Sequence, residues 1–284
     1  LADSGTFGYK FTVQGTAPTG TGATALWVDR VAASYSQTLC ARYASTDGVS
    51  FTTKAGCTNY AVGGGRINNV NAPTSPVSIT QQIKDAGAAG YVASDLLLVD
   101  GGSNDAADLI AAYLRAGTDG GASYKALLST VLDAATVNAA LAGGSAGLAQ
   151  AGGAYMKALA AQFAATLKAL DKGATRIAVL NVPDILKTPR FKLVVASIAA
   201  AQGTAASVQA TAVFDAWIQA FNTQLSASFA GDSRVAVVNF NESSKDQADH
   251  PAQYQLSNTT TPVCPATGRG SDGLPTYSFP TCTA

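Results

Sequence analysis

The sequence predicts an α/β fold with a doubly wound parallel sheet, because three short apolar runs are separated by long helical segments. The runs are Leu96 to Val99, Arg176 to Val182 and Arg234 to Phe240. None shows the alternation of apolar and polar residues typical of a strand with one wet face, so each is expected to be buried on both sides. Buried strands that alternate with helices indicate a parallel sheet covered by helices.

The segments between these runs are expected to be mainly helical. Helices are predicted at 24–39, 78–89, 127–141, 147–170 and 205–229. In the segment 147–170, Tyr155, Leu159 and Phe163 recur every four residues and mark one apolar helix face. A further strand is expected at 59–62, before three consecutive glycines, and the tail from Glu242 onward is expected to be rich in loops.

The composition favours one large domain spanning residues 1–284. Of the 284 residues, 47% are hydrophobic and 13% are charged, which is enough apolar material for a full core. Eighteen basic residues balance eighteen acidic ones without a basic cluster, which argues against nucleic acid as a partner and favours a neutral substrate. No apolar run reaches the roughly 18 residues that a transmembrane helix needs.

No cofactor is expected. The chain has a single histidine, His250, and no metal-ligand spacing, which makes a zinc enzyme improbable. The glycine run Gly63 to Gly65 lacks the spacing of a phosphate-binding loop.

The four cysteines form two local pairs, Cys40 with Cys57 and Cys264 with Cys282. Neither pair has zinc spacing, so two disulfides are expected, each worth about 3 kcal/mol in the chain-entropy model. Disulfides would imply a secreted or periplasmic protein. The alternative is four free thiols in a cytosolic protein.

The stretch around Asn104 is the strongest candidate site. A buried strand ends at Gly101 and Gly102, and a helix follows, which puts Asn104 at the carboxyl edge of the sheet, where α/β folds place their ligands. If the strand at 59–62 lies nearby, the Gly64 N–H and the Asn104 amide converge on one point. Two such donors suit the oxyanion that develops in acyl transfer. The alternative is an ordinary strand-to-helix turn.

Three blocks of the chain resemble the GDSL, or SGNH, esterase and lipase family. Leu1 to Gly5 is similar to the back half of its first block, Asn59 to Gly64 to its second, and Gly102 to Asp105 to its Gly-x-Asn-Asp third block. Residues further along the chain resemble the secreted bacterial branch of this family. They are Phe221, Asn222, Gln224, Leu225, Pro251, Ala252, Tyr254, Asn258 and Cys264.

The resemblance implies a flavodoxin-like three-layer α/β/α fold and hydrolysis of carboxylic esters, either small or lipid-like, by a serine nucleophile. It gives Asn104 and Gly64 the two oxyanion-hole roles, with Gly63 as the fallback if the register slips by one residue. Acyl transfer to another alcohol would use the same residues.

The resemblance also leaves half of the site unassigned. It puts the nucleophile immediately before Leu1 and the Asp-x-x-His pair beyond the cysteine-containing tail, so the domain is expected to lack its first strand and its last segment. Two alternatives remain. Ser4 and His250 form a triad with Asp246 or Asp249, or the chain is a catalytically incomplete relative that binds carbohydrate or lipid.

Overall fold

The centre of the protein is a parallel sheet of three strands. The computed structural model describes residues 26–45, 47–262, 266–270 and 275–277. The strands are β3 (Leu97–Asp100), β4 (Ile177–Leu180) and β5 (Val235–Val238), hydrogen-bonded in the order β3-β4-β5. Leu97 pairs with Ile177, and Ile177 pairs with Val235, so the three strands end level at one carboxyl edge. The three predicted apolar runs are these strands.

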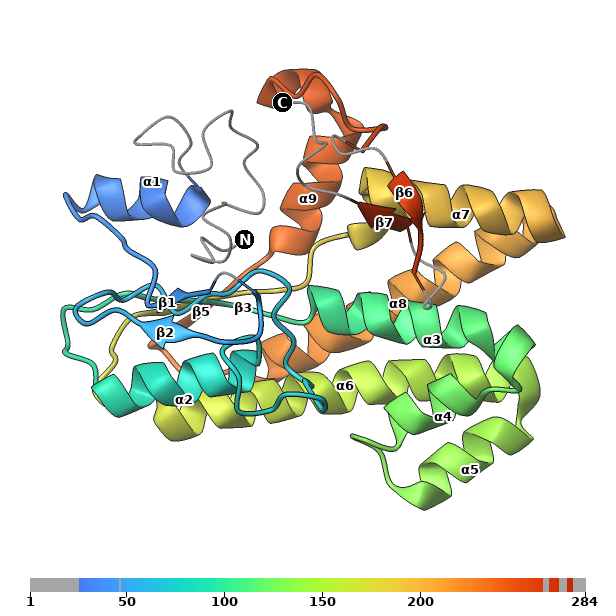
Figure 1. Ribbon diagram of the computed structural model, residues 1–284, viewed down its shortest axis with the longest axis horizontal. Coiled ribbons are helices and arrows are strands. Elements are labelled where there is room, and N and C mark those ends of the chain that lie inside the picture. Colours follow the sequence, from blue (N-terminus) through green and yellow to red (C-terminus); the bar gives the residue numbers. More distant parts are fainter. Residues whose placement is uncertain (1–25, 46, 263–265, 271–274, 278–284) are drawn as a thin grey trace.

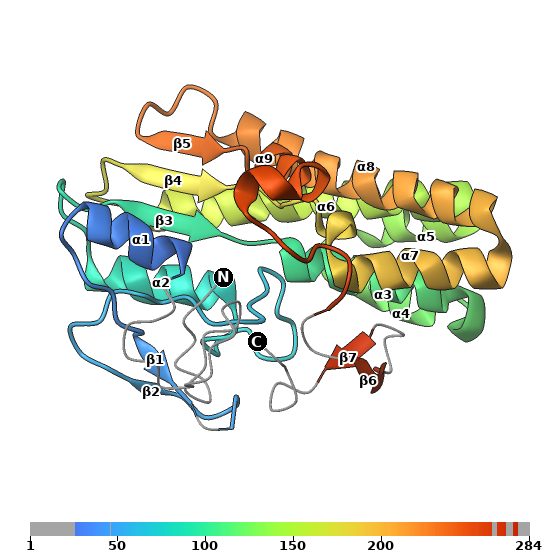
Figure 2. The ribbon, with the colours of Figure 1, turned by 90° about the horizontal axis from the view of Figure 1, so that it is seen from above.

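Helices cover the sheet from both sides, which gives the α/β/α arrangement. Helices α1 (Trp27–Ser34) and α9 (Phe240–Asp249) lie on one side, while α2 (Ile79–Ala89) and α6 (Gly144–Leu170) lie on the other (Figures 1 and 2). In β4, Ile177 and Val179 are almost fully buried, whereas Val238 in β5 is 43% exposed.

The remaining helices extend beyond the carboxyl edge (Figure 2). They are α3 (Ser103–Asp119), α4 (Ala122–Leu128), α5 (Ala134–Ala142), α7 (Pro189–Gln202) and α8 (Thr204–Ser228). Trp217 on α8 packs against Tyr113 and Tyr124, with ring centroids 5.3 and 6.3 Å away. It also donates from its indole nitrogen to the Ala149 carbonyl at 2.7 Å. An added Cβ at Gly152 would lie 2.3 Å from the Trp217 ring, so this glycine permits the close approach of α6 and α8.

The other described elements are short. They are the strands β1 (Tyr43–Ala44), β2 (Thr52–Thr53), β6 (Ala266–Arg269) and β7 (Pro275–Tyr277), and the 3₁₀ turns η1 (Ile185–Lys187) and η2 (Pro251–Tyr254). Their sheets, β1-β2 and β6-β7, are antiparallel pairs.

The predicted disulfide between Cys40 and Cys57 is present and encloses β1 and β2. The predicted pair Cys264 and Cys282 lies outside the described residues. The disulfide is compatible with an extracellular location. Within the described ranges, no helix is both long enough and apolar enough to cross a bilayer.

Four details differ from the sequence prediction. Residues 59–62 form no strand, because only Asn59 makes a bridge, to Ala41. The helix predicted at 127–141 is interrupted after Leu128, and a new helix begins where the Asp133 side chain caps the Thr136 N–H. The start of the tail continues as helix α9 to Asp249, capped by Asn239. Helix α7 was not predicted; Thr188 caps it and Pro189 opens it.

Candidate functional site

The glycine run after residue 62 forms a tight turn. The Gly65 N–H donates to the Val62 carbonyl at 3.2 Å, and Gly64 is the third residue of the turn, with a φ of +78°. This is the pattern of a type II turn, which requires a positive φ at that position and therefore favours glycine. Gly64 is exposed, and no group in the described part of the chain accepts its N–H. The turn therefore presents a backbone donor to its surroundings.

Side chains of helix α3 hold this turn against the carboxyl edge. The amide nitrogen of Asn104 donates to the Gly65 carbonyl oxygen at 2.9 Å. Arg66 donates to the Gly64 carbonyl at 2.8 Å and forms a two-point ion pair with Asp108, in which Nη2 lies 2.9 Å from Oδ1. The two residues predicted to act together, Gly64 and Asn104, are thus brought to the same turn.

Asn104 retains hydrogen-bonding capacity after this contact. Its amide nitrogen has two hydrogens, and the contact with Gly65 uses one of them. Among the described residues, no acceptor is found for the second hydrogen. The Asn104 side chain therefore combines an anchoring bond with a spare donor.

Asp105 fixes the chain immediately after the turn. Its carboxylate accepts the Ile67 N–H at 3.0 Å and the Asn68 N–H at 2.8 Å, and the residue is only 2% exposed. Burial raises the pKa of Asp105 to about 6, although the two N–H donors act in the opposite direction. The helix α3 N-terminus and the loop are therefore joined through a carboxylate that water does not reach.

Glycines at the end of β3 allow the close packing that positions α3. Gly102 precedes the helix with a φ of +100°. An added Cβ there would lie 2.8 Å from Val182 Cγ2 and 2.9 Å from Phe221 Cζ. Any larger residue would displace the first turn of α3, and with it Asn104 and Asp105.

The carboxyl ends of β4 and β5 are joined by a network of side-chain amides. Asn222 on α8 accepts the Val182 N–H at 2.8 Å and donates to the Val182 carbonyl at 2.9 Å. Asn181 donates to Asn239 at 3.0 Å and accepts the Asn241 N–H at 2.8 Å. These amides are engaged with neighbouring groups, and Asn222, at 5% exposed, and Asn241, at 2%, are buried.

His250 lies at the far end of α9. Its Nδ1 is 2.8 Å from the Asp246 carboxylate, and both side chains are about half exposed. The pKa of Asp246 is lowered by the Tyr254 hydroxyl first and by His250 second. Helix α9 rises away from the carboxyl edge (Figure 1) and has ten residues, so His250 is about 15 Å from its start. Ser4, its suggested partner, lies outside the described residues.

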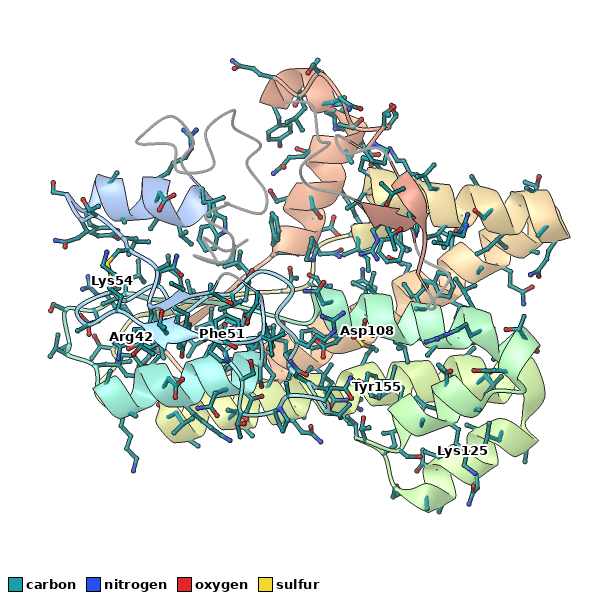
Figure 3. All side chains as sticks on the ribbon, in the orientation of Figure 1. Arg42, Phe51, Lys54, Asp108, Lys125 and Tyr155 are labelled. Atoms are coloured by element: carbon teal, nitrogen blue, oxygen red, sulfur yellow. A yellow bond between two sulfur atoms is a disulfide. The ribbon has the colours of Figure 1, made fainter. Side chains whose placement is uncertain are left out.

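Several supporting residues were not singled out from the sequence. They are Arg66, Asp105 and Asp108, which tie the turn to α3, and Asn68, which donates to Thr130 at 2.6 Å and to Tyr155 at 2.9 Å. Asp108 on α3 and Tyr155 on α6 are labelled in Figure 3. The only signal in the sequence was the pair of carboxylates after Asn104: Asp105 follows it directly, and Asp108 comes three residues after Asp105. Among the described residues, no group of three acidic, histidine or cysteine side chains has the arrangement of a metal site.

Comparison with known proteins gives one match. A family model described as GDSL-like Lipase/Acylhydrolase matches residues 3–274. Neither a curated protein nor a solved structure matches the chain.

Proposed function

Because the chain belongs to the GDSL-like lipase/acylhydrolase family, we propose that it hydrolyses carboxylic esters through a serine acyl-enzyme. In this proposal the Gly64 N–H and the Asn104 amide bind the oxyanion of the tetrahedral intermediate. The observation that carries it is the hydrogen bond from Asn104 to Gly65, which ties the amide to the turn that exposes the Gly64 N–H.

The proposed donors fit what an oxyanion hole requires. Donors must be oriented before the reaction, so that no reorganisation is needed as negative charge develops. The type II turn, the Arg66 contact with Gly64 and the two N–H bonds to Asp105 all restrain the loop that carries the donor. Asn104 is restrained by its own contact with Gly65 while a second hydrogen stays available.

The nucleophile and its base complete the proposal. A serine attacks the ester carbonyl, a histidine takes its proton and later delivers it to the leaving alcohol, and water then releases the acid. The proposal assigns the two oxyanion donors to described residues and leaves the serine and the Asp/His pair to be identified by labelling. A triad histidine must reach the serine hydroxyl within hydrogen-bond distance, so His250, which pairs with Asp246 at the exposed end of α9, would serve only if that serine lies beside it.

The first test is the Asn104→Ala variant of the full-length protein, assayed with p-nitrophenyl acetate. We expect kcat to fall by about 10²- to 10³-fold, the typical effect of losing one oxyanion donor. Asn138→Ala is the matched control, because Asn138 is an exposed residue of α5. An unchanged kcat for Asn104→Ala would remove Asn104 from the mechanism.

A second test identifies the nucleophile. A fluorophosphonate probe reacts with an activated serine, and peptide mass spectrometry then locates the label. We expect the label on a single serine, which the peptide map identifies. A label on Ser4 would favour a triad within this chain. No label, together with no hydrolysis of any ester, would favour the binding protein that lacks catalysis.

The proposal also covers the cellular location and the substrate class. We propose that the protein is secreted or periplasmic, which the Cys40–Cys57 disulfide supports, and that its substrate is a small or lipid-like ester.

A further inference from the structure

A hollow of about 570 Å³ begins at the Val62–Gly65 turn and runs between the following loop and helices α3 and α4. Gly64 forms one border. The loop contributes Asn68, Asn69 and Asn71, and α3 contributes Ala111 and Ala112. The volume lies within the range of pockets that hold small molecules. A group bound here would be next to the proposed oxyanion donor.

Two of the three charged residues that line the hollow form an ion pair. Arg66 and Asp108 neutralise each other in their two-point ion pair. Arg115, the other cation in the lining, is also engaged in an interaction with the protein. Two arginines and one aspartate leave one positive charge in the lining beyond the Arg66–Asp108 pair, so charge does not select the ligand and the choice depends on the amides.

Three neighbouring amides supply hydrogen-bonding groups. Asn69 accepts the Ala72 N–H at 3.1 Å through its carbonyl oxygen, which leaves its two N–H groups without a partner among the described residues. The amide of Asn68 donates both of its hydrogens, to Thr130 and Tyr155, and keeps its carbonyl oxygen available. Asn71 is exposed and has no side-chain partner in the described ranges. Donors and acceptors are thus present together, as a hydroxyl group requires.

Small residues on α3 create the space. Ala111 and Ala112 are 2% and 4% exposed and form the floor of the hollow. Because a longer side chain at either position would project into it, the hollow depends on these two alanines.

We propose that this hollow binds the alcohol part of the ester and that this alcohol is polyhydroxylated, as in a sugar or glycerol. The proposal rests on the proposed function, since Gly64 is both the oxyanion donor and the border of the hollow. An aliphatic chain would leave the three amides without partners, which costs free energy when water is displaced.

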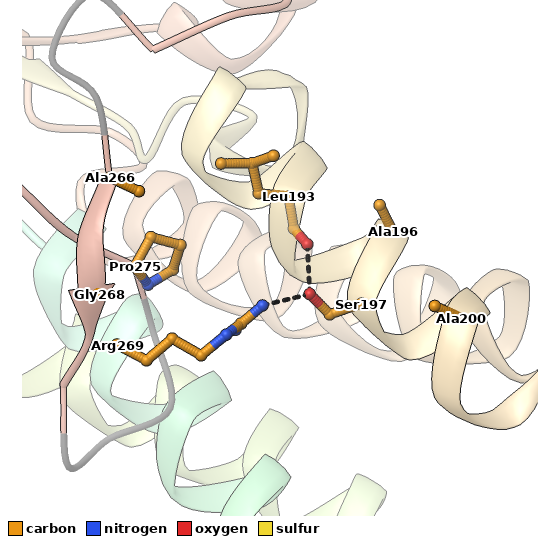
Figure 4. Close-up of a pocket in the computed structure, with 8 residues that line it drawn as sticks. All are labelled: Leu193, Ala196, Ser197, Ala200, Ala266, Gly268, Arg269 and Pro275. Atoms are coloured by element: carbon orange, nitrogen blue, oxygen red, sulfur yellow. Dashed lines mark hydrogen bonds between the residues drawn. The ribbon is translucent and has the colours of Figure 1, made fainter.

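A second hollow has a different character. It holds about 350 Å³ between α7 and the β6-β7 hairpin, and its lining is mainly Leu193, three alanines and Pro275 (Figure 4). Within it, Arg269 donates to the Ser197 hydroxyl. None of its lining residues belongs to the glycine turn or to α3, so it is not part of this proposal.

The experiment measures kcat/KM of the full-length protein for three acetate esters: 6-O-acetyl methyl glucoside, monoacetylglycerol and ethyl acetate. We expect the double variant Asn69→Ala/Asn71→Ala to lower the ratio of the glucoside or glycerol value to the ethyl acetate value by about tenfold, from two lost hydrogen bonds. The larger decrease identifies the sugar or the glycerol as the ligand. Asn138→Ala should leave the ratio unchanged. A ratio unaffected by the double variant would overturn the proposal.

Two further measurements separate the possible failures. Ala112→Leu should lower the same ratio. If the variant instead loses hydrolysis of p-nitrophenyl octanoate more than that of p-nitrophenyl acetate, the hollow binds the acyl chain and the proposal is overturned.

Saturation-transfer NMR of the Asn104→Ala variant with methyl glucoside and with glycerol tests binding without hydrolysis. Binding that Asn69→Ala/Asn71→Ala removes supports the hollow even if no ester is hydrolysed. Hydrolysis of esters without binding of either polyol rejects the hollow alone.

Discussion

The carboxyl edge of the sheet is built in two different ways at its two ends. Where β4 and β5 end, Asn181, Asn222, Asn239 and Asn241 bond to one another and to Val182. Where β3 ends, Asn104 makes one bond to the glycine turn, beside a Gly64 N–H that has no acceptor in the described part of the chain. The Asn181, Asn222 and Asn241 amides also donate only one of their two hydrogens, but Asn222 and Asn241 are buried, whereas Asn104 is half-buried beside an exposed glycine, so accessibility separates the two ends.

The comparison shows that residue type at a sheet edge does not identify a site. Asn222 and Asn104 are both asparagines near strand ends, yet Asn222 uses its oxygen and its nitrogen on the backbone of a single residue. What distinguishes the candidate site is unused hydrogen-bonding capacity next to open space.

Asn222→Ala should give the largest loss of stability at the β4–β5 end of the edge. This change leaves the buried Val182 N–H without its acceptor, which costs about 1–3 kcal/mol, while the Val182 carbonyl loses one of two bonds and keeps the one from Asn241. We expect the free energy of unfolding, measured with urea, to fall by about 2–4 kcal/mol, while the kcat of the folded enzyme is preserved.

Asn104→Ala should show the reverse behaviour in the same two measurements. It loses one partly buried hydrogen bond, so its stability should fall by only about 0.5–1.5 kcal/mol while kcat falls strongly. If both variants lose stability equally and neither loses kcat, the two ends of the edge are equivalent and the assignment of the site is wrong.

Gly102→Ala tests the junction between the two ends. The left-handed backbone conformation costs an alanine about 1–2 kcal/mol, and the contact with Val182 and Phe221 adds strain. We expect a loss of about 2–4 kcal/mol in thermal or urea unfolding. Gly120→Ala is the matched control, because Gly120 also has a positive φ of 64° but has no atom within 4 Å of an added Cβ. An equal loss in both variants would show that packing at Gly102 contributes nothing.

The smallest expected effect is the pH dependence that Asp105 introduces. Its folded pKa of about 6 lies above the ordinary aspartate value of about 3.9, so the folded state binds more protons between these values. The contribution of Asp105 to stability is therefore fully present below pH 4 and is lost as the pH rises to about 6.

Asp105→Asn removes this titration. We expect the difference in unfolding free energy between wild type and variant to change by on the order of 1–3 kcal/mol between pH 4 and 7, in the direction of relatively lower wild-type stability at high pH. The difference isolates Asp105 from carboxylates such as Asp232 and Asp246, whose lowered pKa values give the opposite slope. A difference that is independent of pH would show that Asp105 titrates as an ordinary aspartate.

Local patterns were sufficient to predict much of the fold. The apolar runs that became β3, β4 and β5 are continuous and bounded by polar residues or glycine, and Tyr155, Leu159 and Phe163 mark the buried face of α6. Residues 59–62 could not be assigned correctly, because Asn59 alone makes a bridge, through bonds with Cys40 and Arg42, and the Ala61 N–H turns back to the Asn59 side chain. Likewise, the interruption after Leu128 depends on one capping aspartate inside an alanine-rich segment.

The sequence by itself determined the parallel sheet, the Cys40–Cys57 pairing and the presence of Asn104 at a strand end, because each follows from neighbours in the chain. Only the tertiary structure decided which amides stay accessible, that Asp105 is buried, and that a hollow borders Gly64. These properties depend on groups about 40 residues apart in the chain meeting at one place, and no local pattern records which hydrogen bonds such a meeting satisfies.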